Sequence, residues 1–251
     1  MKNFTPQSAP LSKFLPAWLG MLLILFFGVY LPLQGFVILA LQIWQLEGGL
    51  SWEVPLMMTI HRTATPPLDR LAVLLTQFGS YKTVAPIAAA IGLTLMLQKR
   101  WRSLVYLIMT LTGCAAINLV AKTFWHRVRP HLWEGSVLPQ DFSFPSGHAM
   151  TSMAFAAVLI ALAWGNRWLK ITVLLVSIYV VTIGWTRLYL GVHYPSDILA
   201  GWLLSIAWAI GVSAFVKPAA RMVAEFAADK SESNQTIEEK TLEISSQKTV
   251  E

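Results

Sequence analysis

The chain has 251 residues, of which 55% are hydrophobic and only 13% are charged, and its formal net charge is +6. Soluble domains carry about 25% charged residues, so this composition, with a mean hydropathy of +0.57, indicates an integral membrane protein. The basic residues lie in short loops between apolar stretches, which argues against a nucleic-acid partner. The single cysteine, Cys114, excludes an intrachain disulfide and a cysteine-based metal site, and we expect a buried thiol.

Six apolar stretches approach the length of about 20 residues that a transmembrane helix needs. We therefore predict an all-α fold, a six-transmembrane helix bundle, and we expect a bend at Pro32 in the first stretch. The stretches cover residues 15–44, 83–97, 104–121, 149–165, 169–186 and 198–216.

Between the first two stretches, Pro66 and Pro67 precede leucines at helical spacing, Leu68, Leu71, Leu74 and Leu75. The pattern predicts an extra interfacial helical segment on the outer side. A short helix packed inside the protein fits the same pattern.

The distribution of basic residues predicts the orientation of the chain, because cytoplasmic loops are rich in lysine and arginine. An even number of spans with both termini cytoplasmic fits all of the basic groups. The loops then expected on the outer side are residues 45–82, 122–148 and 187–197. The basic groups are Lys2 and Lys13, then Lys99, Arg100 and Arg102, then Arg167 and Lys170, and finally Lys217 and Arg221.

One reactive cluster, Ser146, Gly147 and His148, directly precedes the apolar stretch 149–165. This position predicts a helix N-terminus, where free backbone N–H groups favour an anion. Gly147 would let the backbone approach a ligand closely. Ser146 could equally be a helix cap with His148 merely adjacent.

A second cluster places Lys122 and Arg129 at the outer end of the third stretch. Both cations suit phosphate oxygens, although snorkelling at the membrane surface explains any one of them. We interpret Arg127 as a snorkelling residue, and His126 and His131 as bystanders.

The third cluster joins Arg187, His193 and Asp197 across a turn between the last two stretches. Four residues separate His193 from Asp197, so the carboxylate can reach the imidazole across one helical turn. Such a carboxylate fixes the tautomer of a catalytic histidine. Alternatively, Asp197 simply occupies the first turn of a helix, where acidic residues are favourable.

Together and in this order, the three clusters resemble the type 2 phosphatidic acid phosphatase (PAP2) family, and in particular its bacterial lipid phosphatases of the phosphatidylglycerophosphatase B and undecaprenyl-diphosphatase type. The resemblance covers residues 67–216. One departure is Thr186, where the family usually has serine, and a hydroxyl is retained.

The resemblance implies a role for each matched residue. His193 would attack phosphorus and form a phosphohistidine, Asp197 would orient it, and His148 would protonate the leaving oxygen. No cofactor or metal is implied, since three cations can compensate the spread charge of phosphoryl transfer. The expected phosphate-binding residues are Lys122, Arg129, Ser146, Gly147 and Arg187.

The expected function is hydrolysis of a lipid phosphate, with the site facing the outside or periplasm of a plasma (inner) membrane. Candidate substrates are undecaprenyl diphosphate, phosphatidylglycerol phosphate, phosphatidate and diacylglycerol diphosphate. A non-catalytic phospholipid-binding or transport protein with the same basic pocket is the alternative. The predicted organisation is an N-terminal anchor span with an outer loop (1–66), a PAP2-type catalytic membrane domain (67–216) and a charged, disordered cytoplasmic tail (217–251).

Overall fold

The computed structural model describes residues 17–45, 49–133 and 141–218. The regular elements within these ranges are helices, with no strands, which confirms the predicted all-α class. Most of the predicted tail, residues 219–251, lies outside the described residues. In chain order the elements are α1 (Ala17–Leu25), η2 (Phe26–Tyr30), α2 (Leu31–Gln45), α3 (Glu53–His61), α4 (Pro66–Gln77), α5 (Tyr81–Leu97), α6 (Trp101–Trp125), α7 (Gly147–Ala163), α8 (Leu169–Tyr189) and α9 (Pro195–Val216).

Long apolar helices occupy the predicted stretches, but the count of six spans is not confirmed. Four helices in the described ranges are long and apolar enough to cross a membrane, namely Trp18–Gln45, α6, α8 and α9. Helices α4 and α5 together make a fifth candidate, bent by 43°. Helix α7 has 17 residues, about 25 Å at 1.5 Å per residue, and is therefore shorter than a typical hydrocarbon core.

The leucine-rich segment forms α4, as the spacing predicts, but its interfacial position is not confirmed. Its buried residues are Ala72 and Thr76, while Leu71 and Leu74 remain exposed. Helix α4 packs against α8, and the Tyr189 hydroxyl donates to Asp69 at 2.6 Å. One face of α4 is thus fixed to the bundle and its apolar face points outward.

The first span contains a π-helical segment instead of a sharp bend at Pro32. Proline has no N–H, and its ring clashes with the carbonyl four residues earlier, which here belongs to Gly28. The π-helical segment η2 covers this position and widens the turn. Gly28 also lies against Ile210 of α9, because a Cβ at Gly28 would be 2.6 Å from the Ile210 side chain.

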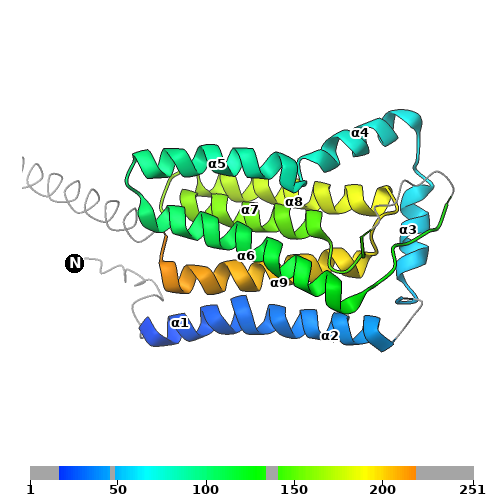
Figure 1. The fold of residues 1–251 in the computed structure, drawn as a ribbon, viewed down its shortest axis with the longest axis horizontal. Helices are drawn as coiled ribbons and strands as arrows, with labels where there is room; N and C mark the ends of the chain where they lie inside the picture. Colours follow the sequence, from blue (N-terminus) through cyan, green and yellow to red (C-terminus); the bar gives the residue numbers. More distant parts are fainter. Residues whose placement is uncertain (1–16, 46–48, 134–140, 219–251) are drawn as a thin grey trace, which may run out of the picture.

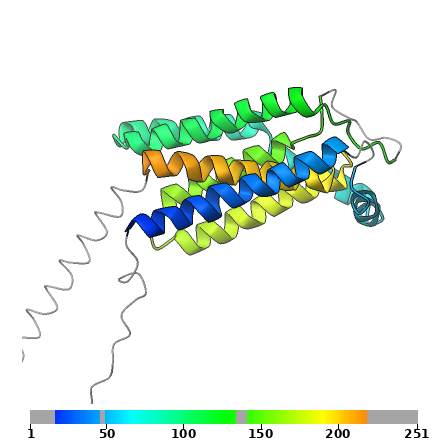
Figure 2. The ribbon, with the colours of Figure 1, turned by 90° about the horizontal axis from the view of Figure 1, so that it is seen from below.

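Helix α9 lies at the centre of the bundle and packs against α2, α6 and α7. Figure 1 shows the long helices running along one axis, with α3 crossing one end of the bundle. The view turned by 90° in Figure 2 places α3 at the same end. At that end Gly201 of α9 approaches the backbone before α7: a Cβ there would be 3.0 Å from the Ser146 carbonyl oxygen. Glycine therefore allows the start of α7 to pack on α9.

We predict that Gly201→Val destabilises the protein by about 1–3 kcal/mol, because overpacking forces the backbone or side chains to shift. Gly211→Val on the same helix is the matched control, since no described heavy atom lies within 4 Å of its Cβ position. Thermal unfolding of both variants in detergent would measure the difference. Equal unfolding temperatures would contradict the close packing at Gly201.

Candidate active site

A cavity of about 360 Å³ lies at the α3 end of the bundle, between α5, α6, α7 and α8. Most of the predicted site residues line it, although they are up to 71 positions apart, from Lys122 to His193. Ser146 and Asp197 are fully buried behind the lining. The predicted residues in the lining are Lys122, Arg129, Gly147, His148, Arg187 and His193.

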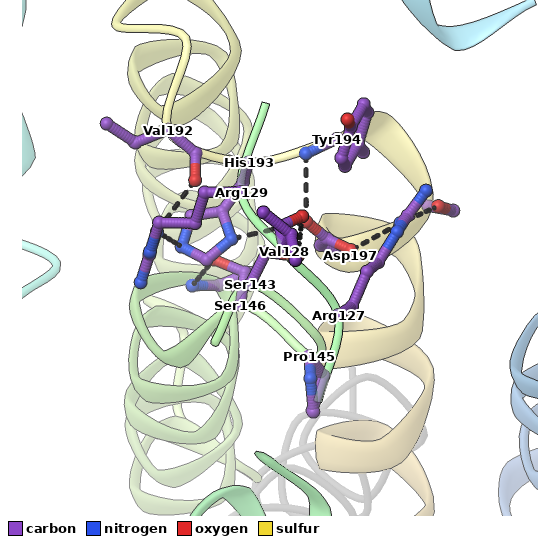
Figure 3. Close-up of polar contacts among 12 residues, drawn as sticks. Arg127, Val128, Arg129, Ser143, Pro145, Ser146, Val192, His193, Tyr194 and Asp197 are labelled. Atoms are coloured by element: carbon purple, nitrogen blue, oxygen red, sulfur yellow. Dashed lines mark hydrogen bonds and ion pairs between the residues drawn. The ribbon is translucent and has the colours of Figure 1, made fainter. Parts of the chain in front are cut away.

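His193 lies between a cation and a carboxylate, as Figure 3 shows. The Arg129 Nη1 atom is 3.0 Å from His193 Nε2, and the Asp197 Oδ2 atom is 3.4 Å from Nδ1. Arginine can only donate hydrogen bonds and an ionised carboxylate can only accept them. The proton of a neutral imidazole is therefore on Nδ1, and the Nε2 lone pair accepts from Arg129, which also lines the cavity.

The electrostatic surroundings also favour the neutral ring. Burial lowers the pKa of His193 well below its usual range, and the nearby charges of Arg187 and Arg129 lower it further. The side chain is only 1% exposed. At neutral pH the imidazole is thus neutral, with no proton on Nε2, and can act as a nucleophile through that atom.

Lys122 and Arg129 share one carboxylate, that of Asp141. Arg129 Nη2 donates to Asp141 Oδ1 at 2.7 Å, and Lys122 Nζ pairs with Oδ2. Burial opposes ionisation of Asp141, but these hydrogen bonds outweigh it and lower the pKa of Asp141 to about 2. Because the Asp141 side chain is 54% exposed, an incoming anion can compete with it for both cations.

Arg187 is buried against the cavity and is held by α4. Its Nη1 atom donates to Thr76 Oγ1 at 2.8 Å, whereas its buried Nε has no hydrogen-bond partner among the described residues. Buried donors without partners are rare in folded proteins, so this Nε is a candidate donor to an anion in the cavity. Thr186 beside it bonds back to Ile183 O within α8, so the departure from serine lies outside the cavity lining.

The Ser146–His148 segment begins α7 as predicted, and Ser146 acts as a helix cap. Its Oγ accepts from Ala149 N at 3.4 Å, and its N–H donates to Asp197 O at 3.0 Å. Asn118, which the sequence analysis missed, donates to Pro145 O at 3.0 Å. A Cβ on Gly147 would lie 3.2 Å from Asn118 Oδ1, so glycine keeps this corner of the cavity open.

The interpretation of Arg127 as a snorkelling residue is wrong. Its side chain is 8% exposed and pairs with Asp197 Oδ1 at 2.5 Å and with Glu53 Oε2 at 2.7 Å. Asp197 is consequently shared between Arg127 and His193, not committed to His193 alone. A cation that reads as a surface anchor in the sequence is here buried because two carboxylates compensate its charge.

Three further residues of the site were not found from the sequence. Asp141 lies four positions before Pro145, and its charge next to a reactive cluster is a signal that could have identified it. Asn118, one helical turn before Lys122 on α6, is a polar residue in an apolar stretch and carries a similar signal. Glu53 carries none, because it is 144 positions from Asp197.

Within residues 17–45, 49–133 and 141–218, no three His, Cys, Asp or Glu side chains are grouped so that they could hold a metal ion. The charges that face the cavity come from Lys122, Arg129 and Arg187, opposed by Asp141. The arrangement can therefore hold an anion of several oxygens beside the Nε2 atom of His193.

Residues 101–221 match the profile of the PAP2 superfamily. The chain thus carries a PAP2 family domain in a multi-pass membrane protein.

Individual proteins resemble the chain over more residues than this match covers. It is 28% identical to an undecaprenyl-diphosphatase of Sulfolobus acidocaldarius, over 74% of this chain and 84% of that protein. It is 29% identical to phosphatidylglycerophosphatase B of Bacillus subtilis, over 56% of this chain and 71% of that protein. The crystal structure of a transmembrane PAP2-type phosphatidylglycerolphosphate phosphatase from Bacillus subtilis superposes with a TM-score of 0.67 at 26% identity, covering 74% of this chain and 96% of that one.

We predict that Asp141→Asn binds inorganic phosphate more tightly, by about three- to tenfold, because the anion no longer displaces a carboxylate from two cations. Calorimetric titration of the detergent-purified protein would measure this. Asp69→Asn is the matched control, since Asp69 is an exposed acid of α4 that does not line the cavity. Unchanged or weaker phosphate binding in Asp141→Asn would contradict the competition.

The lowered pKa of His193 predicts a loss of stability in acid. The unfolded chain takes up a proton near its ordinary pKa, whereas the folded chain does not, so the folded state loses stability below that pH. Between about pH 7.5 and about pH 5, the wild type should lose about 2 kcal/mol more unfolding free energy than His193→Gln. Asp141 stays ionised over this range because its pKa is about 2. Chemical unfolding in detergent at both pH values is the measurement, and parallel losses would refute a neutral buried imidazole.

Proposed function

We propose that the protein hydrolyses a lipid phosphate through a phosphohistidine formed on His193, without a metal cofactor. The observation that carries the proposal is the Nε2 atom of His193, which carries the lone pair of the neutral ring and lies 3.0 Å from Arg129 in the wall of a cavity that three cations line. A nucleophile beside fixed positive charge is what phosphoryl transfer needs, since catalysis there is mainly positioning and charge compensation.

In the first step the substrate phosphate enters the cavity and displaces Asp141 from Lys122 and Arg129. These cations and Arg187 then hold the phosphate oxygens, and the free Nε donor of Arg187 gains a partner. Nε2 attacks phosphorus, a P–N bond forms, and the bond between phosphorus and the leaving oxygen breaks. His148 takes up a proton as the phosphate anion enters, because the anion offsets the charge of the three cations near the ring, and it donates that proton to the leaving oxygen.

In the second step water hydrolyses the phosphoenzyme. His148, now neutral, takes a proton from the water as its oxygen attacks phosphorus, and the P–N bond breaks. Inorganic phosphate leaves and the neutral His193 is restored, with its Nδ1 proton still facing Asp197.

A lipid substrate is supported by the surroundings of the cavity. The helices that surround it are apolar. The names of the relatives given above indicate undecaprenyl diphosphate and phosphatidylglycerophosphate as their substrates. We propose that the substrate is one of undecaprenyl diphosphate, phosphatidylglycerol phosphate, phosphatidate and diacylglycerol diphosphate, all of which present the same phosphate group.

We further propose that the site faces the outside or periplasm. Figure 1 places the α5–α6 and α7–α8 junctions at the end of the bundle opposite to the cavity. Those junctions carry Lys99, Arg100 and Arg102, and Arg167 and Lys170. Basic loops favour the cytoplasmic side, so the cavity would open on the other side.

The alternative is a non-catalytic protein that binds or transports phospholipid with the same basic pocket. The three cavity cations alone would be enough for such a protein to bind a phosphate headgroup. It offers no reason for a neutral histidine whose proton is held on Nδ1 by a carboxylate, and this observation favours the enzyme.

The test is phosphate release from each of the four lipids by purified protein in detergent with EDTA. We expect release by the wild type and a loss of at least about 1000-fold in His193→Ala, because the nucleophile is removed. His131→Ala is the matched control, since that histidine is exposed and does not line the cavity.

Any of three results would overturn the proposal or one of its parts. Equal release by His193→Ala would exclude the phosphohistidine, and binding of lipid without any release would favour the non-catalytic alternative. Loss of wild-type activity in EDTA would refute the metal-free mechanism.

A further inference from the structure

A second polar cluster lies behind His193, on the side away from the cavity. It consists of Glu53, Arg127 and Ser196, and it contacts the carboxylate of Asp197. Glu53 is in the first turn of α3, outside residues 101–221 that match the PAP2 profile. The cluster therefore joins a segment outside the family domain to the proposed catalytic centre.

Glu53 is fully buried, and both of its oxygens are occupied. Oε1 accepts from the backbone N–H of Ser196 at 3.1 Å and from the Ser196 hydroxyl. Oε2 accepts from Leu50 N at 2.7 Å and from Arg127 Nη2 at 2.7 Å. A buried carboxylate is tolerated only with such complete hydrogen bonding, so the position of Glu53 is tightly defined.

Arg127 bridges the two buried carboxylates, as Figure 3 shows for its contact with Asp197. Nη2 binds Glu53, while Nη1 donates to Asp197 Oδ1 at 2.5 Å and to the Ser196 hydroxyl at 2.7 Å. The guanidinium carbon lies 4.1 Å from the centre of the Tyr194 ring, which covers it. The planar guanidinium is thereby held in one orientation.

This arrangement divides the two oxygens of Asp197 between different tasks. Arg127 holds Oδ1, which leaves Oδ2 to accept from Tyr194 N at 2.9 Å and from His193 Nδ1 at 3.4 Å. The carboxylate cannot rotate without losing the contact to Arg127. The direction of Oδ2, and with it the orientation of the imidazole, therefore depends on Arg127 and Glu53.

The net charge of the cluster also supports a role in the reaction of His193. Two carboxylates and one guanidinium leave a formal charge of −1 beside His193. A positive charge that develops on the imidazole during attack on phosphorus would be balanced by it. None of these groups except His193 lines the cavity, so they would not contact the phosphate.

We infer that Glu53 and Arg127 are positioning residues that act on His193 through Asp197, an inference that rests on the proposed function. Loss of Arg127 should then lower kcat and leave KM for the lipid phosphate unchanged, because the three cavity cations stay in place. Removing the hydrogen-bonding partners that orient metal-ligating histidines costs about 10- to 100-fold in activity, and we expect a loss of similar size for this oriented histidine.

The experiment is a double-mutant cycle on phosphate release with Arg127→Gln, Asp197→Asn and the combination. If Arg127 acts through Asp197, the combination is no slower than Asp197→Asn alone, within about twofold. Arg62→Gln is the matched control, an exposed arginine next to α3 that should keep wild-type kcat. Losses that multiply in the combination would overturn the inference.

Arg127→Gln leaves two buried carboxylates without a cation, so it could fail to fold. The double variant Glu53→Gln with Arg127→Gln removes a carboxylate and the cation together, and replacing both members of a buried pair is far less costly. We expect this variant to fold with wild-type KM and a kcat still lowered about 10-fold or more. Wild-type kcat in it would show that the pair only supports folding and would refute the positioning role.

The outcome for His193→Ala separates this inference from the proposed function. If His193→Ala keeps full activity, the proposed function fails. If His193→Ala is inactive but the double variant has wild-type kcat, only the positioning role of Glu53 and Arg127 fails.

Discussion

The burial of ionised side chains at one end of an apolar bundle is the constraint on which the structure depends. Glu53 and Asp197 are fully buried, and Arg127 is nearly so. A buried charge that loses its partner costs about 3–5 kcal/mol, so these groups must meet one another. They come from the start of α3, the segment after α6 and the start of α9. Meeting that requirement aligns three distant parts of the chain and places His193 beside them.

The cations at this end fall into two groups with different surroundings. Arg127 is enclosed, and its partners are carboxylates, a hydroxyl and an aromatic ring inside the protein. Lys122, Arg129 and Arg187 line the cavity instead. Asp141, the carboxylate that pairs with Lys122 and Arg129, is half exposed, and one donor of Arg187 is unpartnered among the described residues. Arg127 therefore has a structural environment that is fully satisfied within the protein, whereas the charge of the cavity-lining cations stays accessible to an anion.

Much of the site could be predicted because its residues form compact local patterns. A serine, glycine and histidine before an apolar stretch indicate a helix start, and the structure begins α7 at Gly147. A histidine four residues before an aspartate indicates a contact across one turn, and His193 and Asp197 make it. Arg127 and Arg129 are two positions apart in the same loop, and no local signal separates them. Their different roles follow from Glu53 and Asp141, which contact one arginine each among the described residues.

The sequence by itself determined the all-α membrane class and the clusters that converge on the cavity, because apolar length, helix caps and residue spacing are local properties. It did not determine the number of spans, since α7 is short and α4 and α5 meet at a bend of 43°. The tertiary structure alone decided that Asp197 is shared between His193 and Arg127, that Asp141 pairs with Lys122 and Arg129 and that Glu53 belongs to the site. The reason is physical: which carboxylate compensates which buried cation depends on distances in space, and residues far apart in the chain carry no mark of them.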